Sequence, residues 1–252
     1  MKRTLVGRRI LVTRPVDQAA PLVRELERRG ARVLVSPTIR LVPARSAALT
    51  AALKELAAGR FDWITLTSST TVDVLHERLM SPRDVRSQVA AIGEGTAAAF
   101  RRWARREPDL QPATFTTAAL ARAFPRGSGR VLCARADIAP EGLEDVLARK
   151  GWEPVRVDAY RTIFASSLPR EARDAVRAGE VDAVTFTSAS TVQGFINALG
   201  AARGTPRVIC IGPVTAAAAR AAGLRPAAVA TPHTVEGLIA ALERALPSES
   251  MA

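Results

Sequence analysis

Short apolar segments alternate with amphipathic segments along most of the chain. Continuous apolar runs predict buried strands at residues 8–13, 31–37, 63–67, 89–93, 130–134, 153–157, 181–187 and 207–212. Helical spacing of apolar residues predicts helices at 21–30, 46–59, 71–80, 96–106, 140–151 and 234–246. Strands without polar alternation, separated by helices, are typical of parallel sheets covered on both faces. The pattern therefore predicts an α/β protein.

The chain also repeats itself. The stretch FDWITLTSSTTV begins at Phe61, and the closely similar VDAVTFTSASTV begins at Val181. Further segments match in the same order and at nearly the same separation: 10–15 with 131–136, 22–30 with 143–151, 91–99 with 210–218, and 116–120 with 234–238. The first of these pairs aligns Arg14 with Arg135. A set of ordered matches predicts a tandem duplication of one doubly wound α/β unit, with a period far longer than that of a solenoid.

In each half the alternation pauses after the second strand, at 37–45 and at 158–170. If both pauses are crossings between domains, residues 1–37 and 168–252 form one discontinuous lobe. Residues 45–158 then form an inserted lobe, and 38–44 and 159–167 are the two linker segments. A simpler alternative is two end-to-end domains that divide near residue 125, with GSG at 127–129 as their linker.

Hydroxyl-rich loops follow four of the predicted strands, namely TSST (67–70), GEGT (93–96), TSAS (187–190) and GPVT (212–215). Ligands of parallel α/β sheets bind where strands end and helices begin, and free amides at a helix N-terminus favour anions. The same residues can instead cap helices. Ser190 with Gln193 matches a capping box, and Pro213 suits a first helical turn. Ligand contact and capping therefore both stay open.

The composition adds a strong positive charge. The chain carries 36 Lys and Arg residues against 24 Asp and Glu, a formal net charge of +12 at pH 7. Such a surplus predicts affinity for anions. Nucleic acid is one candidate, but aromatic residues make up only 4% of the chain, the arginines are dispersed, and no nucleic-acid-binding motif occurs. A polyanionic small molecule fits the charge equally well.

Other kinds of site find little support in the sequence. Cys133 and Cys210 each lie within an apolar strand, which predicts buried thiols. The histidines His76 and His233 have no metal-ligand spacing, so neither a metal site nor a Ser-His-Asp hydrolase is expected. No apolar run is long enough for a membrane span, and the start lacks a secretory-signal pattern. We expect a cytoplasmic monomer.

Several motifs together resemble one known family. They are LVTRP near the start, the paired strand-TS loops, VDAYRT, IGPVTAAAARAAGL and TVEGL. Taken as a set, and over nearly the whole chain, they resemble uroporphyrinogen-III synthase. The resemblance implies two flavodoxin-like doubly wound lobes joined by a two-segment linker. It implies no cofactor and no metal.

The resemblance also implies a reaction. The linear tetrapyrrole hydroxymethylbilane loses water and closes to uroporphyrinogen III, with its last ring inverted. Each pyrrole ring carries an acetate and a propionate, so a polycarboxylate substrate would account for the positive charge. The main task is to hold the substrate in one conformation around a reactive cation, which needs no strong acid-base pair. A flavodoxin-like FMN-binding protein and a non-catalytic two-lobed binding protein stay open as alternatives.

The site residues follow from matching the family's motifs to this sequence. Tyr160, the single tyrosine of the chain, matches the family's tyrosine at the linker and is expected to assist departure of the hydroxyl. An aromatic side chain that simply packs at a domain junction is the alternative. Thr96, Ser188 and Thr215 fall at the family's binding positions.

Two further residues are predicted to bind substrate. Ser68 is the repeat partner of Ser188 and is assigned to the substrate on that ground. Arg14 is assigned to a substrate carboxylate, although it could equally pair with a nearby acid at the sheet edge.

Overall fold

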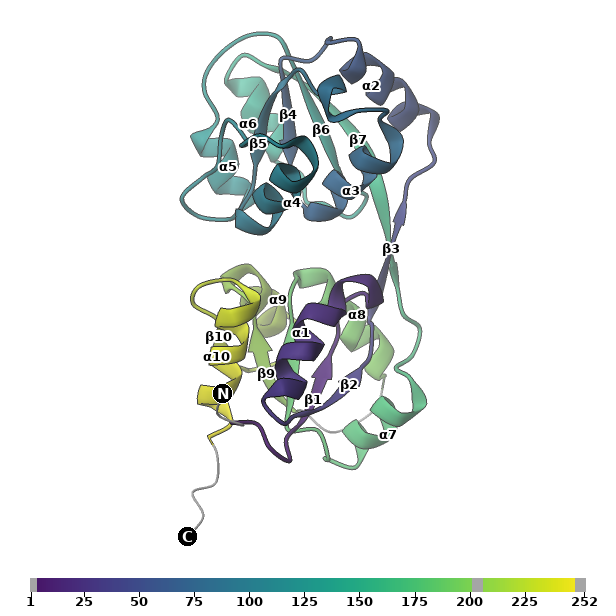
Figure 1. Cartoon of the computed structure of the whole chain (residues 1–252), viewed down its shortest axis with the longest axis vertical. Coiled ribbons are helices and arrows are strands. Elements are labelled where there is room, and N and C mark those ends of the chain that lie inside the picture. The colour runs from purple at the N-terminus through teal and green to yellow at the C-terminus, as the bar shows by residue number, and fades with distance from the viewer. Residues whose placement is uncertain (1–3, 201–205, 248–252) are drawn as a thin grey trace. The chain divides into compact units, whose positions relative to one another are not determined.

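The chain divides into two compact units in the computed structural model, which describes residues 4–200 and 206–247. We call Met1–Arg40 together with Ile163–Ala252 the terminal lobe, and Leu41–Thr162 the inserted lobe. Within the described residues, each lobe is built on one five-stranded sheet (Figure 1). The predicted two-lobed α/β fold is therefore confirmed.

The terminal lobe has a purely parallel sheet with the strand order β10-β9-β8-β1-β2. If its strands are numbered along the chain within the lobe, this is the order 5-4-3-1-2, which is that of flavodoxin-like folds. The strands are β1 (Arg9–Val12), β2 (Arg32–Val35), β8 (Ala183–Phe186), β9 (Arg207–Cys210) and β10 (Pro226–Val229). The helices are α1 (Val16–Arg28), α7 (Arg170–Arg177), α8 (Ala189–Leu199), α9 (Pro213–Ala221) and α10 (Val235–Ala245).

The inserted lobe has the strand order β3-β7-β6-β4-β5. From β7 to β5 its neighbouring strands are parallel. The strands are β3 (Ile39–Pro43), β4 (Trp63–Leu66), β5 (Gln88–Ala91), β6 (Arg130–Ala136) and β7 (Glu153–Phe164). The helices are α2 (Ala47–Ala57), α3 (Ser69–Arg78), the 3-10 turn η1 (Pro82–Asp84), α4 (Glu94–Ala104), α5 (Thr117–Ala123) and α6 (Leu143–Arg149).

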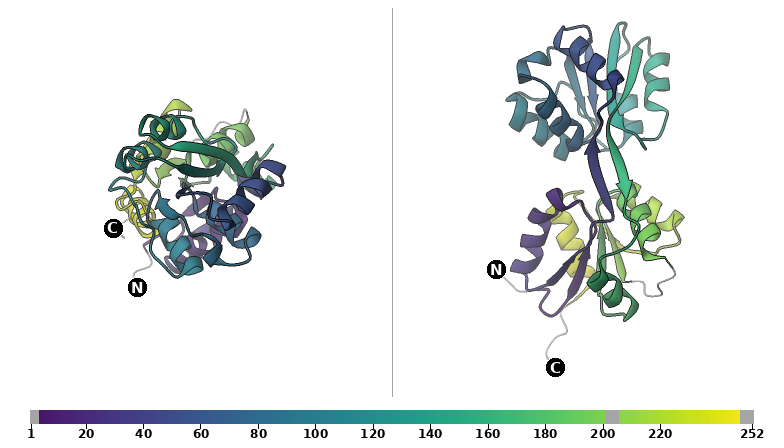
Figure 2. Two further views of the ribbon diagram at one scale, coloured as in Figure 1. Left: turned by 90° about the horizontal axis from the view of Figure 1, so that it is seen from above. Right: turned by 90° about the vertical axis from the view of Figure 1, so that its right-hand side faces the viewer.

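The duplication is visible in these strand orders. Strands β6, β7, β4 and β5 occupy the places that β1, β2, β8 and β9 hold in the terminal lobe. In the inserted lobe, a single parallel bridge between Ala90 and Leu110 lies at the position that β10 has in the terminal lobe. Each lobe therefore combines the first two strands of one repeat with the last strands of the other. The chain crosses between the lobes twice, through β3 and β7 (Figure 2).

Each sheet has an apolar core on both of its faces. In the terminal lobe, Leu11 packs in the core under α7, α8 and α9, while Ile10 and Val12 pack in the core under α1 and α10. In the inserted lobe, Leu132 packs in the core on one face of the sheet, and Val131 packs in the core on the other face. Successive side chains of a strand point to opposite faces. This arrangement explains why the strands read as continuous apolar runs.

Two elements are longer than the sequence pattern predicts. The helix expected at 21–30 begins at Val16 and contains Pro21. A proline there removes one backbone hydrogen bond, but Ala19, Leu22 and Leu26 are buried, and that packing holds the helix together. The strand expected at 153–157 continues to Phe164.

Neighbouring groups extend β7 beyond the apolar run. Ala44 N donates to Ala159 O at 2.9 Å, and Asp137 N donates to Tyr160 O at 3.1 Å. Thr162 N donates to Asp137 Oδ1 at 2.9 Å. These partners are distant in sequence, so the apolar pattern alone could not show them.

Candidate functional site

The carboxyl ends of β1 and β8 form the point of the terminal sheet where the direction of the strand order changes. Arg14 follows β1, and Ser188 follows β8. Thr13 Oγ1 donates to Thr185 O at 2.7 Å and joins the two strand ends. Such a switch point is where open α/β sheets bind their ligands. The terminal lobe thus brings two predicted site residues to the same sheet edge.

Ser188 caps the helix that follows it. Its Oγ accepts a hydrogen bond from Thr191 N at 3.2 Å, and Thr191 Oγ1 accepts one from Ser188 N at 3.2 Å. The capping box predicted for Ser190 and Gln193 is therefore wrong, because the helix starts two residues earlier than that pattern requires. The amide of Gln193 instead donates to Asn197 Oδ1 at 2.9 Å along the helix surface.

In the inserted lobe, Tyr160 and Ser68 are in direct contact. The Tyr160 hydroxyl donates to Ser68 Oγ at 3.0 Å. Ser68 also caps α3 by accepting from Thr71 N at 3.1 Å, and its Oγ lies 3.2 Å from Thr71 Oγ1. Burial raises the pKa of Tyr160, and the hydrogen bond to Ser68 offsets only part of that rise. The phenol therefore keeps its proton at neutral pH and directs it toward Ser68.

The loops before α4 and α9 are built differently from the two serine loops. Gly93 and Gly212 are their N-caps, and among the described residues no side chain caps either helix. Thr96 and Thr215 occupy the third helical position and are buried, with 6% and 4% of their surface exposed. The first turn of a helix has backbone N–H groups without helical partners. These two loops are therefore better suited to receive an anion than the self-capped serine loops.

Pro213 is the first residue of α9, as predicted. The equivalent position in α4 is Glu94, whose carboxylate forms an ion pair with Arg101. That pairing partly neutralises the acid, so it opposes an anion at the start of α4 less than an isolated carboxylate would.

Two rings lie against the glycine caps, and the sequence analysis did not identify them. A Cβ atom added to Gly93 would lie 2.8 Å from Cγ of Phe115, and one added to Gly212 would lie 3.5 Å from Cγ of His233. His233 is held by contact of its Nδ1 with Ala230 O at 2.9 Å. The signal was available, because the matched segments 116–120 and 234–238 place these two residues immediately before equivalent helices.

Arg14 has no acidic partner of its own. Among the described residues it forms no ion pair, and its buried Nε has no hydrogen-bond partner. Burial lowers the pKa of Arg14, and the nearby charge of Asp17 opposes that change. The structure therefore contradicts the alternative in which Arg14 pairs with an acid at the sheet edge.

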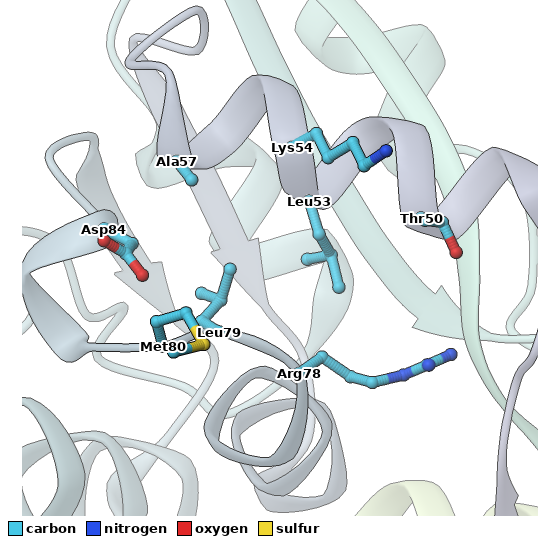
Figure 3. A pocket seen from close by; sticks show the side chains of 8 residues that line it. All are labelled: Thr50, Leu53, Lys54, Ala57, Arg78, Leu79, Met80 and Asp84. Carbon is cyan, nitrogen blue, oxygen red and sulfur yellow. The ribbon is translucent and has the colours of Figure 1, made fainter.

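The inserted lobe also has a cavity of about 260 Å³ with a different lining (Figure 3). It is lined by α2 and by the segment that follows α3, with Leu53, Leu79 and Met80 among its walls. None of the predicted site residues lines it. We therefore place the candidate site at the strand ends.

Cys133 and Cys210 are fully buried, as predicted, and burial raises their pKa values to about 12 and about 11. No group of three or more metal-ligating side chains occurs in residues 4–200 and 206–247. Within the same residues, no helix is both long and apolar enough to cross a membrane.

The fold and the strand-end loops define a class of two-lobed α/β proteins with a duplicated, flavodoxin-like sheet unit. The family model described as "Uroporphyrinogen-III synthase HemD" matches residues 20–240. The chain belongs to this uroporphyrinogen-III synthase family, whose members act as hydro-lyases in tetrapyrrole biosynthesis.

Individual relatives agree with that assignment over their full lengths. The chain is 28% identical to uroporphyrinogen-III synthase of Synechococcus elongatus, over 96% of this chain and 97% of that protein. It is 31% identical to a putative uroporphyrinogen-III synthase of Methanothermobacter thermautotrophicus, over 92% of this chain and 96% of that protein.

Solved structures show the same fold. A mutant uroporphyrinogen III synthase of Thermus thermophilus superimposes with a TM-score of 0.69 at 22% identity, covering 95% of this chain and 98% of that one. The Helicobacter pylori uroporphyrinogen-III synthetase gives a TM-score of 0.60 at 17% identity, covering 92% of this chain and 97% of that one.

Proposed function

We propose that this uroporphyrinogen-III synthase cyclises hydroxymethylbilane, with loss of water and inversion of the last ring, and that it does so at the strand-end loops. The observation that carries the proposal is the hydrogen bond of 3.0 Å from the Tyr160 hydroxyl to Ser68 Oγ. It joins a buried, protonated phenol to a serine at the start of a helix. This is the arrangement that a leaving hydroxyl group requires from a weak acid.

The substrate's acetate and propionate groups need hydrogen-bond donors more than they need catalytic side chains. The loops of Thr96 and Thr215 supply hydroxyls beside helix N-termini that no side chain caps within the described residues. Ser188 adds a hydroxyl at the switch point of the terminal sheet, and Arg14 adds a cation there. Helix N-termini favour carboxylates both through free N–H groups and through the helix dipole.

One proton moves from the protein to the leaving hydroxyl group and is replaced at the end of the reaction. As the carbon–oxygen bond of the hydroxymethyl group breaks, Ser68 gives its proton to the departing oxygen, which leaves as water. Tyr160 gives its proton to Ser68 along the existing hydrogen bond. The remaining cation is attacked by the last ring of the substrate through its substituted carbon, which gives a spiro intermediate. The bond from that carbon to its original methylene bridge then breaks, and the freed methylene carbon bonds to the unsubstituted carbon of the same ring, which inverts the ring. The proton that this ring finally loses, on regaining aromaticity, restores Tyr160.

The product of the purified protein tests the function. Supplied with hydroxymethylbilane, the protein should form mainly the type III isomer of uroporphyrinogen, whereas spontaneous closure gives the type I isomer. Formation of type I product alone, at the rate seen without protein, would overturn the proposal. A flavin absorption band in the purified protein would instead support the FMN-binding alternative.

Two predictions from the sequence remain to be measured. The monomeric state can be tested by sedimentation equilibrium over a range of protein concentrations. The cytoplasmic location can be tested by fractionating cells that produce the protein.

A further inference from the structure

Arg14 and Arg135 hold equivalent positions in the two repeats: Arg14 lies just after β1, and Arg135 is the penultimate residue of the longer strand β6. Arg135 is held in an ion pair inside the inserted lobe, with 1% of its side chain exposed, although its Nε, like that of Arg14, has no hydrogen-bond partner. Its Nη1 lies 3.0 Å from both carboxylate oxygens of Glu144 and donates to Pro140 O at 3.0 Å. A buried arginine with a hydrogen-bonded carboxylate is a structural ion pair.

Arg14 has lost the counterparts of both partners. The matched segments 22–30 and 143–151 place Val23 where Glu144 stands. The same alignment places Ala19 where Pro140 stands, but Ala19 lies inside α1, whereas Pro140 lies in the loop before α6. Inside a helix, a carbonyl accepts a hydrogen bond from the residue four positions later. The early start of α1 therefore removes the carbonyl partner, and Val23 removes the carboxylate.

The consequence is a partly buried cation without a matching anion. Asp17 contributes some opposing charge but forms no ion pair with Arg14 in the described residues. A desolvated charge that lacks a hydrogen-bonded partner is costly. The position directly after β1, beside β8, is the ligand-binding edge of the sheet. A carboxylate brought by a ligand would supply the partner that the described residues do not provide.

We propose that Arg14 binds one carboxylate of the substrate, and that Val23 keeps Arg14 available for it, because valine gives Arg14 no internal partner. The inference rests on the proposed function. It makes the two arginines of the duplication unequal: Arg14 serves binding, and Arg135 serves stability. Val23 acts through Arg14 and does not itself touch the substrate.

The test grafts the missing partner into the terminal lobe. Val23→Glu should pair with Arg14 and compete with the substrate. Because a hydrogen bond to a charged group contributes about 1.5–3 kcal/mol, KM for hydroxymethylbilane should rise roughly 10- to 100-fold, with kcat changed far less. Val23→Gln is the matched control, since it has the same size without the charge, and its KM should stay close to that of the wild type. Arg14→Gln should raise KM as Val23→Glu does.

Thermal unfolding of each variant separates binding from folding. A folded Val23→Glu protein with wild-type KM would overturn the inference, and so would a folded Arg14→Gln protein with wild-type KM. An equal rise of KM in Val23→Glu and Val23→Gln would also overturn it, because size rather than charge would be the cause. These outcomes differ from failure of the proposed function, in which the wild-type protein itself would form no type III isomer.

Discussion

The two lobes are copies of one unit, yet they keep different chemical groups at the same places. The terminal lobe has an arginine without an internal partner, Arg14, while the inserted lobe neutralises Arg135 with Glu144. The inserted lobe has the Tyr160–Ser68 hydrogen bond. Counting along the chain from the matched strands β2 and β7, the terminal-lobe counterpart of Tyr160 is Ile39, which is the first residue of β3. The proposed roles therefore divide between the lobes: Arg14 binds charge in the terminal lobe, and Tyr160 with Ser68 moves a proton in the inserted lobe.

The largest expected effect comes from making the inserted lobe resemble the terminal lobe. Glu144→Val would leave Arg135 buried without its carboxylate, and removing one member of a buried pair costs about 3–5 kcal/mol. Urea unfolding should show a loss of that size in the free energy of unfolding. The control is Glu171→Gln, which breaks an exposed pair with Arg32 and should cost less than about 1 kcal/mol. Equal urea midpoints for the two variants would contradict the contrast between the arginines.

A smaller effect, on rate, is expected from Tyr160→Phe. Loss of general acid assistance should lower kcat about 100-fold. Loss of one hydrogen bond should cost only about 1 kcal/mol of stability. Ser68→Ala should lower kcat similarly, whereas Ser188→Ala, in the lobe that has Ile39 in place of the tyrosine, should affect KM more than kcat. Steady-state kinetics of the three variants decide the point, and an unchanged kcat in Tyr160→Phe would remove the proton-transfer role.

The pH dependence of stability and activity follows from the direction in which the pKa of Tyr160 shifts. Burial raises the pKa of Tyr160, so the folded protein keeps this proton to a higher pH than the unfolded chain, in which tyrosine titrates near about 10. The contribution to stability is present below that pH and is lost as pH rises through the folded-state value. Activity that depends on Tyr160 should accordingly persist through neutral pH and fall only in strong alkali.

The smallest expected effect concerns the glycine caps. Both backbones are extended at these positions, so alanine adds no backbone strain. Gly93→Ala would push Phe115 from its place and should cost about 1–3 kcal/mol, as overpacking does. Gly212→Ala meets His233 at an ordinary contact distance of 3.5 Å and should cost less than about 0.5 kcal/mol. Thermal unfolding of both variants measures the difference, and equal melting temperatures would show that Phe115 moves without cost.

The fold could be predicted because its signals are local and repeated. Apolar runs such as VDAVTFT identify strands buried on both faces, and ordered matches identify the duplicated unit. The site could be predicted only in part. Ser68 and Tyr160 were each identified, but their contact joins positions far apart in the chain, and no spacing rule shows it.

The state of Arg14 shows a second limit of the sequence. Its lack of a partner depends on where α1 begins, and the helix pattern alone placed that start at Pro21, whereas α1 begins at Val16. The burial of Ala19, Leu22 and Leu26 in the folded lobe stabilises the longer helix. The comparison with Arg135 became informative only when the neighbours of both arginines were known.

The exchange of strands between the repeats has a consequence for synthesis on the ribosome. Strand β1 lies between β2 and β8, in the interior of its sheet. The residues of the inserted lobe, Leu41–Thr162, emerge before β8 is made. Domains generally fold as units during translation, so the inserted lobe can fold while β1 and β2 still wait for their neighbours. In that interval β1 presents an unpaired edge, and unpaired edges promote aggregation. Slow translation of residues 163–252 would lengthen this exposure.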